Sequence, residues 1–174
     1  MFTRYLFGIL LLIAPISWAQ TQQVQVEIAL PTLEVAEYHK PYVALWLSDP
    51  QQQALATLNL WYDAKMPDKE GMTWLKDLRL WWRRTGRTLQ TLDAFTGATR
   101  ASGVHTLRWP LTQAPWRDLP AGEYILHLEV AREVGGREHV SLPFQWPLHA
   151  PLKVQGTHEI SHLSLMPSQS TQGN

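Results

Sequence analysis

The stretch YILHLEVAREVGGREHVSLPF, residues 124–144, contains two strand-like runs joined by a pair of glycines. The runs cover residues 124–133 and 137–144, and each mixes apolar and polar residues in the manner of a strand with one buried face. Gly135 and Gly136 are a signal for a two-residue turn, because glycine tolerates the positive φ that tight hairpins need. We therefore predict an antiparallel hairpin at this point of the chain.

Similar alternation occurs on both sides of the hairpin and predicts further short strands. They are expected at residues 24–30, 43–47, 56–62, 104–109 and around 154–165. About seven short strands at hairpin spacing favour a mainly-β fold, an immunoglobulin-like antiparallel β-sandwich. The alternation does not reveal the order of the strands.

One segment, residues 72–84, departs from the period of two. Its apolar residues recur at helical spacing, namely Trp74, Leu75, Leu78, Trp81 and Trp82. We expect a single inserted amphipathic helix that ends near Gly86. Consecutive residues on a helix point about 100° apart, so we place Trp81 in the contact between helix and sheet.

The N-terminus has the features of a secretory signal peptide. Arg4 precedes a short apolar run at residues 5–13, and small residues stand before Gln20. We expect residues 1–19 to be cleaved, residues 20–166 to form a single exported β-sandwich domain, and residues 167–174 to be a flexible polar tail. No membrane insertion is expected after cleavage, because no later segment is apolar enough to span a bilayer.

The composition excludes several classes of function. The 15 Lys and Arg residues balance the 15 Asp and Glu residues, so the chain lacks the basic surplus of a nucleic-acid-binding protein. The absence of Cys excludes disulfide scaffolds, thiolate metal sites and Cys nucleophiles. Nine Trp residues are far more than usual, and they belong either to the core or to a surface that holds something flat.

One motif carries the strongest chemical hypothesis, DAFTGAT at residues 93–99. It resembles the recognition motif of the bacterial flavin transferase, which takes FMN from FAD, with Mg²⁺, and joins the phosphate to the last Thr or Ser of the motif. The resemblance implies that Thr99 is the covalent attachment point for FMN and that Asp93, Thr96, Gly97 and Ala98 are recognition residues. The alternative is an ordinary loop before a strand, because Gly, Ala and Thr are common loop residues.

Five residues near the motif are candidate contacts for a flavin attached to Thr99. They are Trp82, Arg83, Arg84, Arg100 and His105. Guanidinium groups pair well with phosphate oxygens, an indole can stack on the isoalloxazine ring, and a histidine can hydrogen-bond to it. The alternative is a solvated arginine face with structural Trp and His side chains.

A second motif, His158-Glu159-Ile160-Ser161-His162, matches H-E-x-x-H. On a helix this spacing binds Zn²⁺ and supplies a glutamate base. No His, Asp or Glu follows His162 to act as a third ligand, and the flanking residues fit a terminal strand, in which the two histidines would lie about 13 Å apart. We judge the match of His158, Glu159 and His162 to be accidental and expect no metal site.

The chain as a whole resembles a family of bacterial predicted periplasmic proteins, domain of unknown function 2271. The resemblance covers residues 22–165 and is carried by KPYVALW at 40–46, WLKDL at 74–78, WWRR at 81–84, the string at 93–103 and AREVGGRE at 131–138. It implies a periplasmic β-sandwich, often encoded beside the flavin transferase and membrane reductases of the PepSY class. The family has no settled activity.

These observations predict an exported electron-transfer flavoprotein that carries FMN on Thr99 and works with a membrane reductase. The protein would be a redox carrier more than a stand-alone enzyme, because no substrate-processing residues are evident. The alternative is a non-catalytic periplasmic β-sandwich that binds a partner or ligand through its loops and exposed Trp side chains. A zinc hydrolase built on residues 158–162 is a remote alternative.

Overall fold

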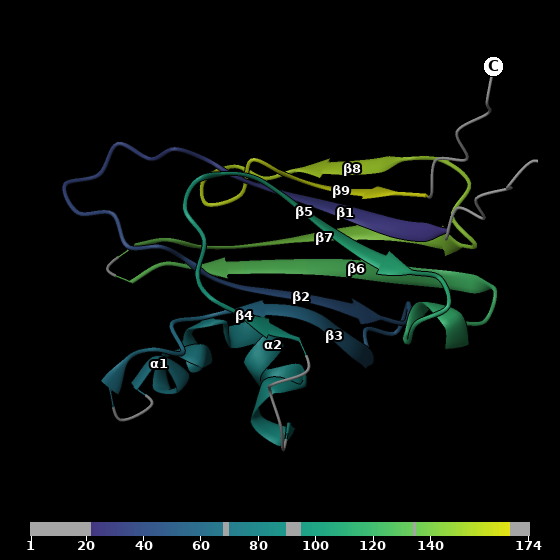
Figure 1. The fold of residues 1–174 in the computed structure, drawn as a ribbon, viewed down its shortest axis with the longest axis horizontal. Helices are drawn as coiled ribbons and strands as arrows, with labels where there is room; N and C mark the ends of the chain where they lie inside the picture. Colours follow the sequence, from purple (N-terminus) through teal and green to yellow (C-terminus); the bar gives the residue numbers. More distant parts are fainter. Residues whose placement is uncertain (1–21, 68–69, 90–94, 134, 168–174) are drawn as a thin grey trace, which may run out of the picture.

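The computed structural model describes residues 22–67, 70–89, 95–133 and 135–167, which form nine strands in two facing sheets (Figure 1). The expected signal peptide, the tail from residue 168 and Asp93 lie outside the described residues. The strands are β1 (Gln23–Leu30), β2 (Tyr42–Ser48), β3 (Ala54–Trp61), β4 (Thr96–Gly97), β5 (Gly103–Pro110), β6 (Gly122–Ala131), β7 (Arg137–Trp146), β8 (Leu152–Gln155) and β9 (His162–Met166).

The first sheet has the strand order β5-β1-β9-β8 and the second has the order β4-β3-β2-β6-β7. All pairings are antiparallel except that of β3 with β4, which is parallel. The prediction of a mainly-β sandwich is therefore confirmed, with two strands more than the expected number. One addition is β4, and the other arises because the strand expected around residues 154–165 is divided.

That division occurs at a turn between β8 and β9. The Gly156 N–H donates to the Ser161 carbonyl over 3.2 Å, so residues 156–161 fold back on themselves. A Cβ atom at Gly156 would lie 2.2 Å from the Ile160 carbonyl oxygen, which leaves no room for a side chain. The expected single strand is wrong because the chain reverses within it.

The hairpin between β6 and β7 is present, but the expected two-residue turn is wrong. β6 ends at Ala131 and β7 begins at Arg137, so residues 132–136 form the connection. The Gly135 N–H donates to the Arg132 carbonyl, and the Arg132 N–H donates to the Gly136 carbonyl. The Glu159 carboxylate accepts from both the Arg132 side chain and the Gly136 N–H, and these bonds hold the wider turn in place.

The main core lies between the two sheets, where alternate strand residues point inward. Buried side chains from β1, β2, β6 and β9 meet there, including Ile28, Leu45, Leu128 and Leu163. A second, smaller core lies on the outer face of the second sheet, where Ala44, Trp46 and Leu60 pack against Leu75, Leu78 and Trp81. The sandwich thus carries a third, helical layer on one side (Figure 1).

The helical layer is not the single helix expected for residues 72–84. It consists of α1 (Glu70–Thr73), a 3-10 turn (Trp74–Asp77), α2 (Arg79–Arg84) and a further 3-10 turn (Gly86–Thr88). The break falls at Leu78, whose ψ of 68° is far from the helical value. The chain can break there because a side chain from the sheet replaces the lost helical hydrogen bonds.

That side chain is Glu129 of β6, whose surface is 0% exposed. Its carboxylate accepts hydrogen bonds from the N–H groups of Leu80 and Trp81, at 3.0 and 2.8 Å. In a continuous helix these two N–H groups would donate to carbonyls four residues earlier. Arg137 of the neighbouring strand β7 donates to the other carboxylate oxygen at 3.0 Å. Glu129 therefore joins the start of α2 to the middle of the second sheet.

We expect Glu129→Ala to lower the free energy of unfolding by about 3 kcal/mol, because it leaves two helix N–H groups buried without acceptors. Urea unfolding followed by tryptophan fluorescence measures the change. Glu123→Ala is the matched control, since Glu123 lies on the same strand β6 with its surface exposed, and it should alter the free energy by no more than about 0.5 kcal/mol. Equal effects of the two substitutions would show that Glu129 has no special part in stability.

Candidate functional site

The segment that contains the TGAT residues crosses from one sheet to the other at the edge of the sandwich. Thr96 and Gly97 pair with Leu60 and Trp61 of β3, and the Tyr62 N–H donates to the Gly97 carbonyl over 3.1 Å. Residues 98–102 then leave the second sheet and reach the start of β5 in the first (Figure 1). An ordinary loop, the alternative interpretation of the motif, does not describe Thr96 and Gly97, because the open edge of β3 pairs with them.

The crossover exposes the residues that matter for the attachment hypothesis. Ala98 and Arg100 are exposed and Thr99 is half-buried. Thr99 is therefore on the surface, two residues beyond the hydrogen-bonded strand β4. The residue proposed as the acceptor lies between strand β4 and the start of β5.

The side chain of Trp61 packs against the crossover and holds it in place. Its surface is 0% exposed, the Arg100 guanidinium carbon lies 4.5 Å from the ring centroid, and the His105 ring meets it edge-on at 5.3 Å. His105 Nε2 also lies 2.8 Å from the Ala101 carbonyl oxygen, to which it can donate. The structure thus brings Arg100 and His105, which both follow Thr99 in the chain, together at Trp61 and gives each a structural contact.

Arg84 does not lie beside Thr99. Its guanidinium donates to the Gln52 carbonyl at 2.7 Å and also to the Gln52 side chain. Gln52 precedes the start of β3, whereas Gly97 pairs with the last residue of that strand, so the two ends are about 20 Å apart. The structure does not bring Arg84 near Thr99.

Trp82 and Arg83 lie on α2. Trp82 is half-buried and packs on the helical core, to which Phe95 also belongs. Its ring lies 6.3 Å from that of the fully buried Trp81. Arg83 is exposed. Trp82 and Phe95, the third residue of the motif, therefore pack on the same cluster.

The H-E-x-x-H residues lie in the turn between β8 and β9 and at the first residue of β9, with no helix. Glu159 is bound to Arg132 in an ion pair of 2.9 Å whose side chains are both 7% exposed, and His162 Nε2 lies 2.8 Å from Glu27. The Glu138 carboxylate accepts from the backbone N–H groups of residues 157–160. The string lacks the helix that the zinc motif requires, and its carboxylate holds the neighbouring hairpin.

A buried polar chain on the outer face of the second sheet was not anticipated from the sequence. Ser48 Oγ lies 2.9 Å from His127 Nε2, and His127 Nδ1 lies 3.1 Å from His139 Nε2. Both imidazole rings stack with Trp46, at centroid distances of 4.8 and 5.6 Å. The sequence does contain a sign of this chain, because the polar residues His127 and Glu129 stand at alternate positions of a central strand. Alternate residues point to the same face of a sheet, so these two give the strand a polar face opposite its apolar one.

The hydrogen bonds of this chain have one consistent direction. Ser48 Oγ donates to the Asp49 carbonyl, so it accepts from His127 Nε2, and His127 Nδ1 accepts from His139. Burial lowers the pKa of His127 to about 4, with the neighbouring His139 and Arg84 acting in the same direction. Burial also lowers the pKa of His139. Ser48 is thus an acceptor toward His127, not a nucleophile activated by it.

We expect stability to fall as the pH is lowered from about 6.5 toward 4. His127 binds a proton in this range when the chain is unfolded but stays neutral when it is folded, so the unfolded state gains protons and is favoured. Urea unfolding at several pH values measures this change for the wild type and for His127→Gln, in which the loss should be smaller. His149→Gln, at an exposed position, is the control. NMR of His127 should find a neutral ring at pH 5, and a charged ring would contradict the prediction.

The comparisons with known proteins agree with the family resemblance. None of the helices in the described ranges is long and apolar enough to cross a membrane. Neither the curated proteins nor the solved structures yielded a match. One family model does match, over residues 23–162, and it is described as "Predicted periplasmic protein (DUF2271)". This span includes all strands from β1 to β8, and the description confirms the expected periplasmic location. The chain belongs to this family of predicted periplasmic proteins.

Proposed function

We propose that this protein carries FMN covalently on Thr99 and serves as a periplasmic electron carrier for a membrane reductase. The observation that carries the proposal is the place of Thr99 in a transferase-like string, on a surface crossover where the small residues Gly97 and Ala98 precede it. A modifying enzyme must take several residues of backbone into its own active site, and a surface loop permits this. The family description, a predicted periplasmic protein, is compatible with such a role.

The attachment is a phosphoryl-group transfer. The Thr99 hydroxyl oxygen attacks the FMN phosphorus of FAD, the anhydride bond between the two phosphates breaks, and AMP leaves. The hydroxyl proton is lost to a base of the transferase or to water, and the product is a phosphodiester with one negative charge. Mg²⁺ belongs to the transferase in this scheme, not to the finished carrier.

The residues around Thr99 fit a bound phosphodiester. Arg100 is the one Lys, Arg, Asp or Glu residue between positions 95 and 107, so the charge next to the attachment point is positive. Its contact with Trp61 holds the guanidinium beside the crossover, where it can pair with phosphate oxygens.

The flavin would supply the electron transfer, and the protein would hold and orient it. His105, fixed through Ala101 and Trp61, is the candidate hydrogen-bonding group. Trp82 is the candidate stacking surface because its ring is half-buried, whereas Trp61 is fully covered. The electron donor proposed from the family resemblance is a membrane reductase of the PepSY class.

We expect co-expression with a flavin transferase to add the mass of one FMN less one water, located at Thr99 by peptide mass spectrometry, and to colour the protein yellow. Thr99→Val should abolish the added mass, since valine has no hydroxyl. Thr106→Val is the matched control, because Thr106 is a half-buried residue of β5 outside the motif, and it should be modified like the wild type.

The positive control is a known substrate of the same transferase, expressed in the same cells. The proposal would be overturned if that substrate became modified while the wild-type chain stayed unmodified and colourless. The non-catalytic binding module would then be the better hypothesis. Its signature is partner or ligand binding that Thr99→Val leaves intact.

A further inference from the structure

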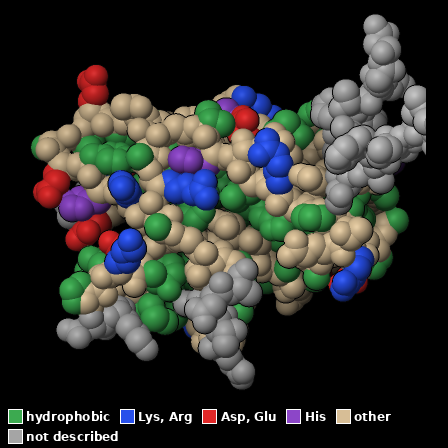
Figure 2. Space-filling view, viewed as in Figure 1, with side chains coloured by type: hydrophobic (Ala, Val, Ile, Leu, Met, Phe, Trp, Pro, Cys, Tyr) green, Lys and Arg blue, Asp and Glu red, His purple; other side chains and the backbone are tan. Residues whose placement is uncertain are grey.

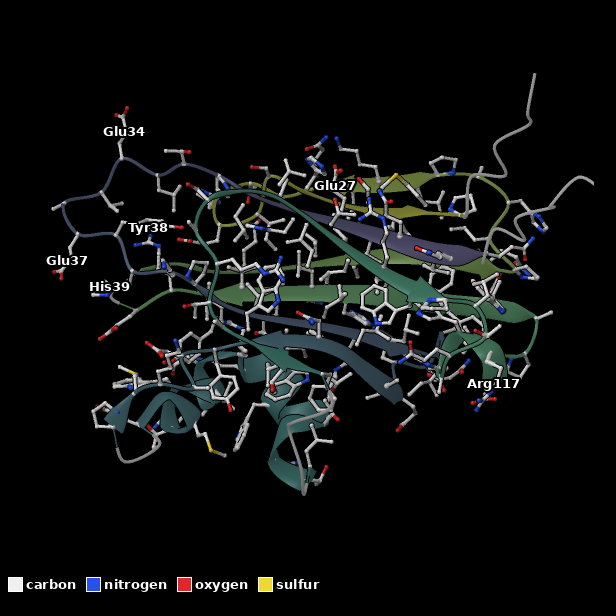
Figure 3. All side chains as sticks on the ribbon, viewed as in Figure 1. Glu27, Glu34, Glu37, Tyr38, His39 and Arg117 are labelled. Atoms are coloured by element: carbon white, nitrogen blue, oxygen red, sulfur yellow. The ribbon has the colours of Figure 1, made fainter. Side chains whose placement is uncertain are left out.

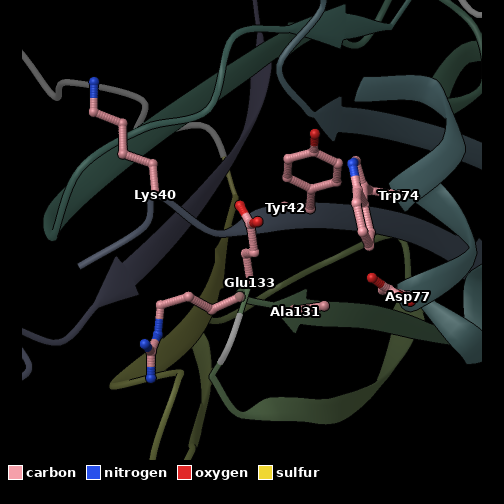
Figure 4. A pocket seen from close by; sticks show the side chains of 7 residues that line it. Lys40, Tyr42, Trp74, Asp77, Ala131 and Glu133 are labelled. Atoms are coloured by element: carbon pink, nitrogen blue, oxygen red, sulfur yellow. The ribbon is translucent and has the colours of Figure 1, made fainter. Parts of the chain in front are cut away.

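A hollow of about 360 Å³, its open mouth included, lies between the start of β2 and the 3-10 turn that precedes α2 (Figure 4). Its lining comes from three separate segments, the loop and strand at Lys40 and Tyr42, the helical layer at Trp74 and Asp77, and the end of β6 at residues 131–133. It is not part of the TGAT crossover. Neither the motif nor the buried histidine chain uses these residues.

Two aromatic rings form one side of the hollow. Tyr42 and Trp74 stand next to each other, and Ala131 lies below them (Figure 4). Trp74 remains 37% exposed. An indole face left open beside a phenol ring is a surface to which organic cations bind.

Two carboxylates face the same space. In Figure 4 the side chains of Asp77 and Glu133 point toward the rings, while Lys40 points away from them. Among the described residues the Asp77 carboxylate has no hydrogen-bond or ion-pair partner, and Glu133 contacts only His39, through one oxygen at 3.5 Å. The other basic side chain at the rim, Arg132, is already bound to Glu159. The two lysine and arginine charges of the lining therefore balance the two carboxylates in number, but the charged groups directed toward the rings are the carboxylates.

The surroundings of Tyr42 agree with this arrangement. Burial raises the pKa of its phenol, and the negative charges of Asp63, Glu133 and Asp77 raise it further. Figures 2 and 3 show that several acidic side chains gather toward this end of the molecule, among them Glu34 and Glu37 on the loop between β1 and β2. These carboxylates contribute negative potential at this end of the molecule.

We propose that the hollow binds a small organic cation of the alkylammonium class. The two rings provide faces for the methyl or methylene groups around the nitrogen, and the two carboxylates neutralise the charge. The two carboxylates that face the rings would repel a phosphorylated or carboxylated ligand. The proposal does not depend on a flavin at Thr99.

The test uses the full-length protein purified without the transferase, so that no flavin is present, and choline as the probe. Isothermal titration and the NMR shift of the Trp74 indole N–H report binding. 3,3-Dimethylbutan-1-ol has the shape of choline without the charge, and it should bind at least about tenfold more weakly if charge recognition operates. Comparison with n-butylammonium tells whether the site prefers a primary or a quaternary ammonium group. Binding of either choline or n-butylammonium supports an alkylammonium ligand.

We expect Glu133→Gln and Trp74→Leu each to weaken choline binding by about tenfold. Glu123→Gln is the matched control for the first, because Glu123 is an exposed carboxylate at the opposite end of β6, and it should bind like the wild type. Circular dichroism checks that each variant folds.

Three results would overturn the proposal. The first is that the neutral alcohol binds as tightly as choline, and the second is that neither cation binds at millimolar concentration. The third is that both variants bind choline as tightly as the wild type. Thr99→Val should leave the affinity for choline unchanged. The cation-site proposal and the proposal of FMN attachment can therefore fail independently.

Discussion

The helical layer of this protein depends on one buried carboxylate. Glu129 accepts two backbone N–H groups at the start of α2 and one guanidinium hydrogen bond from Arg137. A negative charge with no exposed surface is costly unless it is fully hydrogen-bonded, and the start of a helix offers N–H groups with no other acceptor. The carboxylate and the helix start therefore satisfy each other, and this sets where α2 lies on the sheet.

The position of α2 determines much of the rest of the outer face. Trp81, the second residue bound to Glu129, fills the core against the sheet and donates to Thr57. The helical layer also supplies Arg84, whose charge acts on the buried histidines beneath it, and Trp74 and Asp77, which line the hollow. One ionic contact thus supports two features with different chemistry.

The proposed attachment point depends on a different anchor. Trp61 is the last residue of β3, and the segment from Gly97 to His105 packs around it before joining the other sheet. This arrangement holds both ends of the crossover while Thr99 remains on the surface. A rigid frame with an accessible middle suits a residue that an enzyme must reach and that must afterwards hold a group in place.

Local alternation of apolar and polar residues was enough to predict a β-sandwich and seven of its strand-forming stretches, because a strand with one buried face repeats with a period of two. The folded structure was needed to reveal the break at Leu78, the reversal at Gly156, the strand β4 and the separation of Arg84 from Thr99. Each of these depends on a partner distant in the chain, such as Glu129 for Leu80 or Gln52 for Arg84. Periodicity reports which face of a segment is buried, but it carries no information about which distant side chain satisfies its backbone or its charge.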